Sequence, residues 1–162
     1  MRLPLSASRY DALMGGILRT LTRGHKWLHR VSRGRAGKSF PGGALVIWVT
    51  LPGRKSGLPR VTPLLGAPDG DSWVVAGSAG GMSTAPEWAL NAIAAAENPA
   101  SECWLEVRGV TRKIRVINLV DEAERSAAYE KLIHDWRFFR SYALRTSRTI
   151  PVFRLLDCDH YE

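Results

Sequence analysis

The chain of 162 residues has few cysteines and no long hydrophobic run. Its two cysteines, Cys103 and Cys158, lie far apart in no metal-like spacing, which favours reduced thiols in the cytosol over a disulfide framework. No stretch approaches the roughly 18 apolar residues that a transmembrane helix needs. Arg19 and Arg23 interrupt the short apolar stretch 13–21, and no small-residue cleavage site follows, so a secretory signal is not expected. These absences predict a cytoplasmic protein.

Acidic residues are nearly missing from the first 38 positions. That segment carries nine Lys or Arg residues against Asp11 alone, so it holds the whole net charge of +8 and the remainder is neutral. Apolar residues recur there at roughly helical spacing, namely Leu13, Ile17, Leu21, Trp27, Leu28 and Val31. Gly15, Gly16 and Gly24 weaken this helix, so both a continuous and a broken helix stay open at this point. A cationic, amphipathic segment suits anionic lipid, which predicts that residues 1–38 attach peripherally to the inner face of the cell membrane.

The organisation of the chain suggests two parts. A basic arm, residues 1–43, ends in a glycine- and proline-rich link, and the body covers residues 44–162. In the body, short apolar or alternating runs predict strands at 44–51, 61–65, 72–77, 103–107, 112–120 and 150–156. Helices are expected at 87–96 and from Asp121, with Glu124 completing a capping box, to about residue 134, with a continuation to 143. This pattern predicts an α+β fold built on an antiparallel barrel or roll.

The segment Gly53–Arg60, here named the basic loop, concentrates positive charge. Arg54, Lys55 and Arg60 stand within seven positions, and Ser56 adds a hydroxyl. Gly53 and Gly57 allow the backbone to turn its N–H groups toward an anion. Arginine binds phosphate or carboxylate through two hydrogen bonds, and lysine acts as a point charge. The spacing is not that of a P-loop. On charge alone, a solvated hairpin loop is the alternative.

Three motifs stand in a recognisable order: GRKSGLPRVTPLL at 53–65, SAGG followed by PEW and LN at 78–91, and RTSRTIPV at 145–152. Together they resemble the deazaflavin-dependent nitroreductase family, the actinobacterial split-barrel oxidoreductases that use coenzyme F-420. The similarity covers residues 10–157 and includes the basic arm, which points to the membrane-associated nitroreductase and quinone-reductase branch. It implies a split β-barrel with flanking helices and an N-terminal amphipathic arm.

The resemblance also implies a coenzyme site. The basic loop matches family positions that hold the phosphate and oligoglutamyl tail, and later positions match those along the deazaflavin ring. The cofactor-binding residues expected on this basis are Arg54, Lys55, Ser56, Gly57, Arg60, Pro63, Val75, Ala76, Gly77, Ser78, Ala79, Gly80, Gly81, Trp88 and Asn91. For Trp88, packing in the core is the competing interpretation.

An aromatic group marks the expected acceptor site. Trp136, Phe139 and Tyr142 share one helix face, which is equally the spacing of a core stripe. In the family the aligned positions are tyrosines that line the substrate pocket, and Leu65 and Ala79 stand where a close member would have Tyr and Lys. The resemblance therefore implies acceptor binding by Leu65, Trp136, Phe139 and Tyr142. A pocket less polar than the family pattern is expected.

The hypothesis that follows is hydride transfer from reduced F-420 to a quinone, nitroaromatic or enone. A flat acceptor must stack over the reacting carbon at about 3–3.5 Å. Tyr142 and Ser78 are the best candidates to donate to charge that develops on the acceptor, so they are the expected catalytic residues.

Other interpretations remain open. The same fold binds FMN in related enzymes, although FMN lacks the polyanionic tail that the basic loop suits. A non-catalytic module that binds cofactor or lipid is possible, and the oligomeric state is undetermined. Nucleic acid is not the expected partner, because apolar residues in the arm favour lipid over a phosphate backbone. His25 and His29 stand four apart without a third ligand, so no metal site is expected.

Overall fold

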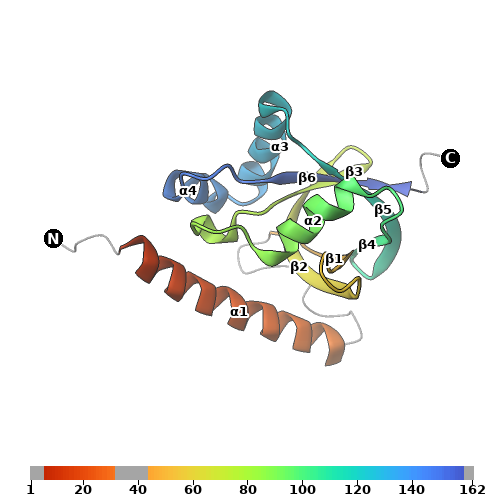
Figure 1. The fold of residues 1–162 in the computed structure, drawn as a ribbon, viewed down its shortest axis with the longest axis horizontal. Helices are drawn as coiled ribbons and strands as arrows, with labels where there is room; N and C mark the ends of the chain where they lie inside the picture. Colours follow the sequence, from red (N-terminus) through yellow and green to blue (C-terminus); the bar gives the residue numbers. More distant parts are fainter. Residues whose placement is uncertain (1–5, 32–43, 159–162) are drawn as a thin grey trace.

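The computed structural model describes residues 6–31 and 44–158. In this part of the chain the strands form a closed antiparallel barrel in the order β1-β2-β3-β6-β5-β4 (Figure 1). The strands are β1 Val46–Pro52, β2 Pro59–Asp69, β3 Ser72–Ala76, β4 Cys103–Val107, β5 Val110–Asn118 and β6 Val152–Asp157. The helices are α1 Ala7–Val31, α2 Glu87–Glu97, α3 Glu122–Asp135 and α4 Phe138–Arg145, with a 3-10 turn, η1, at Ala79–Gly81. The predicted α+β split barrel is confirmed.

The barrel closes around side chains that alternate along its strands. In β1, Ile47, Val49 and Leu51 point inward and are at most 3% exposed. They pack against Phe153 of β6 and Ala92 of α2. Helix α2 covers one side of the barrel. Burying such branched side chains stabilises the fold by about 1.5–3 kcal/mol each. The outer surface of β1 and β2 is left for other elements to cover.

A second apolar cluster lies outside the barrel, under α3 and α4. Leu132 of α3 and Phe139 of α4 pack against Val74 and Val152 of the sheet. Asp121 caps α3 by accepting a hydrogen bond from the Glu124 N–H at 2.9 Å, as the capping box predicts. These contacts fix α4, which carries predicted acceptor-site residues, against the sheet.

Ion pairs tie α3 to the turn between β2 and β3. Asp69 accepts from Lys131 of α3, and from Arg154 Nε of β6 at 3.0 Å. Arg154 also bonds Glu124. The hydrogen bond from Lys131, and next that from Arg154, hold the pKa of Asp69 below its usual value against the opposing effect of burial. The network locks α3 to the barrel away from the basic loop.

The expected elements are all present, with differences at their ends. The second strand was expected at 61–65 and runs from Pro59 to Asp69, because its pairing with β1 extends to Pro52↔Pro59 and its pairing with β3 to Asp69↔Ser72. Between β2 and β3 the chain turns at residues 69–71, where Gly70 has φ 61°. The expected link, residues 34–43, lies outside the described residues.

Helix α1 is continuous, so of the two alternatives that its glycines left open the unbroken helix is the one observed. The reason is tertiary packing, which outweighs weak helix propensity. Gly15 is buried, and a Cβ there would lie 3.5 Å from Met82 Cε. The Tyr10 hydroxyl donates to Gly80 O at 2.5 Å, and Asp11 accepts from the Ser83 N–H at 3.2 Å. The first half of α1 is therefore docked beside η1 (Figure 1).

Candidate active site

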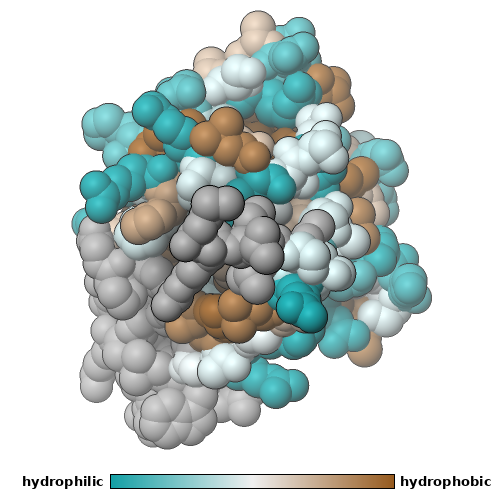
Figure 2. Space-filling view, turned by 90° about the vertical axis from the view of Figure 1, so that its left-hand side faces the viewer, coloured by the Kyte–Doolittle hydropathy of each residue, from teal (hydrophilic) through white to brown (hydrophobic). Residues whose placement is uncertain are grey.

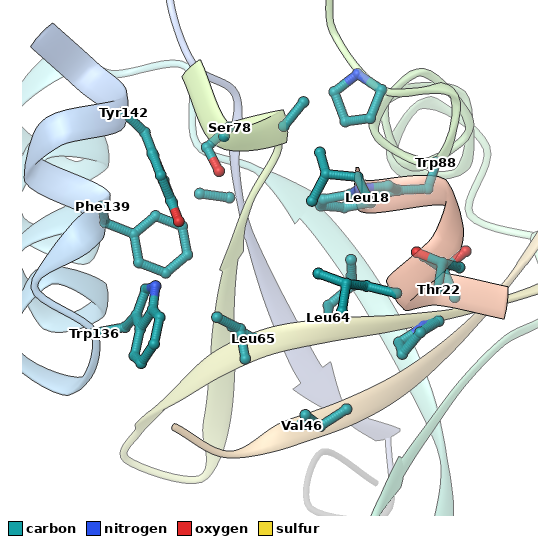
Figure 3. A pocket seen from close by; sticks show the side chains of 17 residues that line it. Leu18, Thr22, Val46, Leu64, Leu65, Ser78, Trp88, Trp136, Phe139 and Tyr142 are labelled. Carbon is teal, nitrogen blue, oxygen red and sulfur yellow. The ribbon is translucent and has the colours of Figure 1, made fainter. Parts of the chain in front are cut away.

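A cavity of about 260 Å³ lies on the outer face of β1 and β2. Its other walls are η1, the start of α2, the aromatic face formed by the end of α3 and α4, and one side of α1 (Figure 3). Apolar side chains dominate the lining, and among the described residues none that lines it is charged. Ligand sites of this kind are mostly apolar with a few placed polar groups. The cavity can hold a flat, uncharged ring system.

Predicted residues of two kinds meet in this cavity. From the expected coenzyme set it contains Pro63, Ala76, Ser78, Ala79, Gly80 and Trp88. From the expected acceptor set it contains Leu65, Trp136, Phe139 and Tyr142. They come from β2, β3, η1 with its N-cap, α2, α4 and, for Trp136, the C-cap of α3, so the folded chain brings them together. The expectation that Trp136 shares one helix with Phe139 and Tyr142 is wrong, because α3 ends at Asp135 and α4 begins at Phe138. In Figure 3 the hydroxyl oxygens of Ser78 and Tyr142 both point into the space between these walls.

Other predicted residues lie behind the lining. The Val75 side chain is 1% exposed inside the barrel. Gly77 and Gly81 are sites of close approach: a Cβ on Gly77 would lie 2.8 Å from Ala89 Cβ, and one on Gly81 would lie 2.8 Å from Tyr142 O. These three residues shape the wall from the rear.

The aromatic wall is rigid. Phe139 packs edge-on against Tyr142 and Tyr129, with ring centroids 5.7 Å apart in each pair. The Tyr129 hydroxyl donates to Phe139 O at 2.8 Å. Burial raises the pKa of Tyr129 to about 12, so this hydroxyl keeps its proton. These contacts fix the position of the side of α4 that faces the cavity.

The basic loop lies beside the cavity and is exposed to solvent. Arg54 Nη1 donates to Glu87 Oε2 at 2.7 Å and to Asn91 Oδ1 at 3.1 Å, and Asn91 Oδ1 also accepts from the Arg54 N–H at 3.2 Å. The hydrogen bond from Arg54, and then its charge, lower the pKa of Glu87. Asn91 is 8% exposed, so the structure assigns it to holding the loop on α2.

The other cations of the basic loop face solvent. Lys55, Ser56, Gly57 and Arg60 are exposed, and Gly57 has φ 67°. β2 begins at Pro59 and reaches the cavity at Thr62, three residues or roughly 10 Å further along a strand. The cationic loop and the apolar cavity are therefore neighbours along β2. A molecule with a flat ring and an anionic tail matches this arrangement.

Two groups of site residues were missed from the sequence. Leu18, Leu21 and Thr22 of α1 line the cavity, although the arm was expected to serve the membrane alone. Their spacing was visible, but nothing in it distinguished a face on lipid from a face on the barrel. Arg148 stands in the RTSRTIPV motif and was given no role. Its guanidinium donates to three carbonyl oxygens of the segment that follows β3.

No cluster of three or more His, Cys, Asp or Glu side chains suited to a metal ion occurs within residues 6–31 and 44–158. Cys103 is buried, and burial raises the pKa of its thiol to about 11. This keeps it a neutral core residue at physiological pH.

Known proteins share both sequence and fold with this chain. The F420H2-dependent quinone reductase of Mycobacterium tuberculosis is 31% identical over 143 residues, covering 82% of this chain and 87% of its own length. A Mycobacterium bovis protein described as a putative F420H2-dependent quinone reductase matches equally well.

Solved structures agree. An F420H2-dependent reductase aligns with a TM-score of 0.59 at 25% identity, covering 68% of this chain and 92% of that one. A chain described as a domain-swapped dimer aligns with a TM-score of 0.63 at 22% identity, covering 91% and 98%. The profile of the F420H2-dependent quinone reductases matches residues 21–157. The chain therefore belongs to the family of F420H2-dependent quinone reductases, and its cofactor is coenzyme F-420.

Proposed function

We propose that this chain transfers a hydride from reduced F-420 to a quinone held in the cavity, with the coenzyme tail on the basic loop. The observation that carries this assignment is that β2 connects two different surfaces. It begins at the end of the exposed cationic loop, and further along it lines an apolar cavity with an aromatic wall. F-420 consists of a flat deazaflavin and a tail of phosphate and carboxylates, so the residues present fit both of its parts. When bound, the reduced deazaflavin supplies the hydride.

In this proposal Lys55 and Arg60 bind the anionic tail, and Ser56 and the backbone around Gly57 add neutral donors. Arg54 shares its guanidinium between Glu87 and the tail. Pro63, Ala76 and the segment from Ser78 to Gly80 lie along the ring, with Trp88 at the end near α2. These roles use charge where the ligand is charged and apolar surface where it is flat.

The acceptor is proposed to stack against Phe139 and Trp136, with Leu65 opposite. A quinone gains negative charge on oxygen when hydride arrives. The hydroxyls of Tyr142 and Ser78 point into the cavity, and in this proposal they donate to that oxygen. The apolar wall favours lipid-soluble quinones. Nitroaromatics and enones of similar size are secondary acceptors, because they offer the same flat shape and also develop charge on oxygen.

The test is the anaerobic oxidation of reduced F-420 by menadione, monitored through the absorbance of the coenzyme. We expect turnover, with kcat lowered about tenfold or more in Tyr142→Phe and in Ser78→Ala. Parallel titrations should show tighter binding of F-420 than of FMN. Absence of turnover would identify a non-catalytic binder, and tighter FMN binding would overturn the coenzyme assignment for this chain.

We further propose that α1 rests on an anionic membrane. Leu13, Ile17 and Leu21 are 56, 43 and 40% exposed and repeat every fourth residue, which makes one continuous apolar stripe. Arg19 and Arg23 are exposed beside it. Within the described residues no helix is both long and apolar enough to span a bilayer. Figure 2 views the molecule from the side on which α1 begins, and hydrophobic surface is exposed there between hydrophilic residues.

The membrane proposal is tested without deleting α1, because that helix also forms part of the cavity. Leu13→Gln with Ile17→Gln should abolish sedimentation with vesicles containing phosphatidylglycerol, because the apolar stripe is lost. Turnover of menadione should stay within about twofold, since neither side chain lines the cavity. Unchanged sedimentation would contradict the proposal.

A further inference from the structure

The segment Gly77–Met82, here named the glycine segment, crosses the rear of the cavity in an unusual conformation. Three consecutive residues have positive φ: Ala79 at 47°, Gly80 at 67° and Gly81 at 83°. Ala79 is not a glycine, so its left-handed backbone is strained. Such a conformation persists only where surrounding contacts hold it in place. The contacts that hold this segment therefore shape the cavity wall.

Arg148 supplies three of the hydrogen bonds that hold this segment. Its Nη2 donates to Gly77 O at 2.8 Å and to Ser78 O at 2.9 Å, and its Nε donates to Met82 O at 3.0 Å. The Thr146 hydroxyl donates to Met82 O as well, at 3.3 Å. One guanidinium thus fastens both ends of the glycine segment. Within the described residues it forms no ion pair with a carboxylate, so its charge acts on these carbonyl groups.

The direction of these bonds decides where the peptide N–H groups point. In a trans peptide the carbonyl of one residue and the N–H of the next point in opposite directions, and no cis peptide occurs in the described chain. With the carbonyls of Gly77 and Ser78 on Arg148, the N–H groups of Ser78 and Ala79 point away from it. Within residues 6–31 and 44–158 neither N–H has a hydrogen-bond partner.

The position of Arg148 and the lining of the cavity together indicate that these two N–H groups face the cavity. Ser78 and Ala79 line it, whereas Arg148 lines a separate hollow behind the segment, together with Tyr129 and Thr149. Ser78 is 6% exposed, so water has little access to its backbone. Two aligned, unpartnered peptide donors in such a place form the kind of arrangement that stabilises developing negative charge on oxygen.

We propose that Arg148 is a positioning residue of this site, which holds the glycine segment so that the Ser78 and Ala79 N–H groups face a carbonyl oxygen in the cavity. This rests on the proposed function for the identity of that oxygen, a quinone carbonyl that becomes an oxyanion as hydride arrives. The guanidinium also polarises the same two peptide groups, which strengthens them as donors. Arg148 itself touches neither coenzyme nor acceptor.

The kinetic test compares Arg148→Met and Arg148→Lys with Arg154→Met. Arg154 is a matched control, because its guanidinium also joins separate elements, through Asp69 and Glu124, but lies outside the cavity lining. Arg148→Met should lower kcat about tenfold to a hundredfold and leave the KM for F-420 within about threefold. Arg148→Lys should restore part of kcat, and Arg154→Met should lower Tm while kcat stays within about twofold. Equal losses of kcat in Arg148→Met and Arg154→Met would overturn the proposal.

A second readout needs no coenzyme. In the free wild-type protein, menadione should shift the amide NMR signals of Ser78 and Ala79, and the shift should be lost in Arg148→Met. Amide exchange of residues 78–82 should also become at least about tenfold faster in that variant, with α2 unchanged. Wild-type signals and exchange in Arg148→Met would overturn the positioning role. If the wild type fails to oxidise reduced F-420 while these amide effects are seen, the proposed function fails and the role of Arg148 stands.

Discussion

The basic loop and the glycine segment are built from similar residues, small glycines beside a serine, and yet they behave oppositely in the fold. The basic loop is exposed from Arg54 to Arg60, and within the described residues Arg54 is the one cation of the loop with hydrogen-bond partners, Glu87 and Asn91. The glycine segment lies against α1, α2 and α4, and its carbonyls are held by Arg148 and Tyr10. An open surface of exposed cations suits a flexible, charged tail. A clamped backbone suits a ring whose reaction depends on position.

This contrast shows how one site divides its tasks. Exposed charges contribute affinity that salt can screen and that tolerates sequence change. Strained backbone contributes geometry, which depends on close packing and tolerates almost no added atoms. The predictions below follow from that division, in order of decreasing expected effect.

The largest effect should come from adding one methyl group to the glycine segment. In Gly81→Ala the residue keeps φ 83°, and its Cβ would lie 2.8 Å from Tyr142 O. Strain and overlap together should cost at least about 3 kcal/mol in the free energy of unfolding. In the basic loop, Gly57→Ala meets only the φ penalty of about 1 kcal/mol, since nothing lies within 4 Å of its Cβ. Urea unfolding of both variants checks this, and equal costs would remove the contrast between the two segments.

Removing one exposed cation from the basic loop should weaken coenzyme binding by about tenfold, or ~1.4 kcal/mol, without affecting stability. Lys55→Ala and Arg60→Ala are the test variants, measured by fluorescence titration of F-420 at two ionic strengths. The deficit should shrink at high salt. Arg115→Ala, an exposed cation on β5, is the control. If Arg115→Ala weakens F-420 binding by the same factor, the basic loop does not bind the coenzyme tail.

Removing the backbone strain at Ala79 in the glycine segment should raise the stability of the protein. Ala79→Gly removes the unfavourable left-handed φ of 47°, and this gain exceeds the entropy cost of glycine in the unfolded chain. We expect the free energy of unfolding to rise by about 0.5 kcal/mol. Ala94→Gly in α2 should lower it by about 1 kcal/mol, as in an ordinary helix. Thermal unfolding of the two variants shows whether each substitution raises or lowers stability. Lower stability in both variants would mean that Ala79 is unstrained.

The smallest effect is expected at Glu87. Its hydrogen bond with Arg54 lowers its pKa below the ordinary 4.5, so the carboxylate stays charged at neutral and mildly acidic pH. Glu87→Gln frees the Arg54 guanidinium and should tighten F-420 binding about twofold to threefold. The difference from wild type should persist from pH 8 to about 5 and shrink only where Glu87 itself becomes protonated, below 4.5. Weaker binding in Glu87→Gln would show that this carboxylate positions Arg54 for the ligand.

Much of the barrel could be read from the chain because its signals are local. Alternating apolar residues predict strands, the residue pair Asp69 and Gly70 predicts a tight turn, and Asp121 with Glu124 predicts a helix start. Each depends on neighbours within a few positions. The resemblance to a known family then supplied the order in which these elements close and the identity of the coenzyme.

The functions of Arg148 and α1 could not be read in this way. Arg148 lies about 70 positions from the carbonyls that it holds, and no local pattern announces such a contact. The same holds for Tyr10 and Gly80, which are also 70 positions apart. For α1 the amphipathic pattern predicted a helix with an apolar side. It did not show that Leu18 would line a cavity while Leu13 faces solvent.

The sequence by itself determined the strands, most helices, the concentration of charge in the arm and the basic loop, and the family. It did so because period, turn chemistry and charge are properties of neighbouring residues. The tertiary structure alone decided that α1 is one continuous helix and a wall of the cavity. It also decided that the glycine segment is clamped from behind by Arg148. Both outcomes depend on packing between distant parts of the chain, where the free energy of contact outweighs the local preference of glycine and alanine.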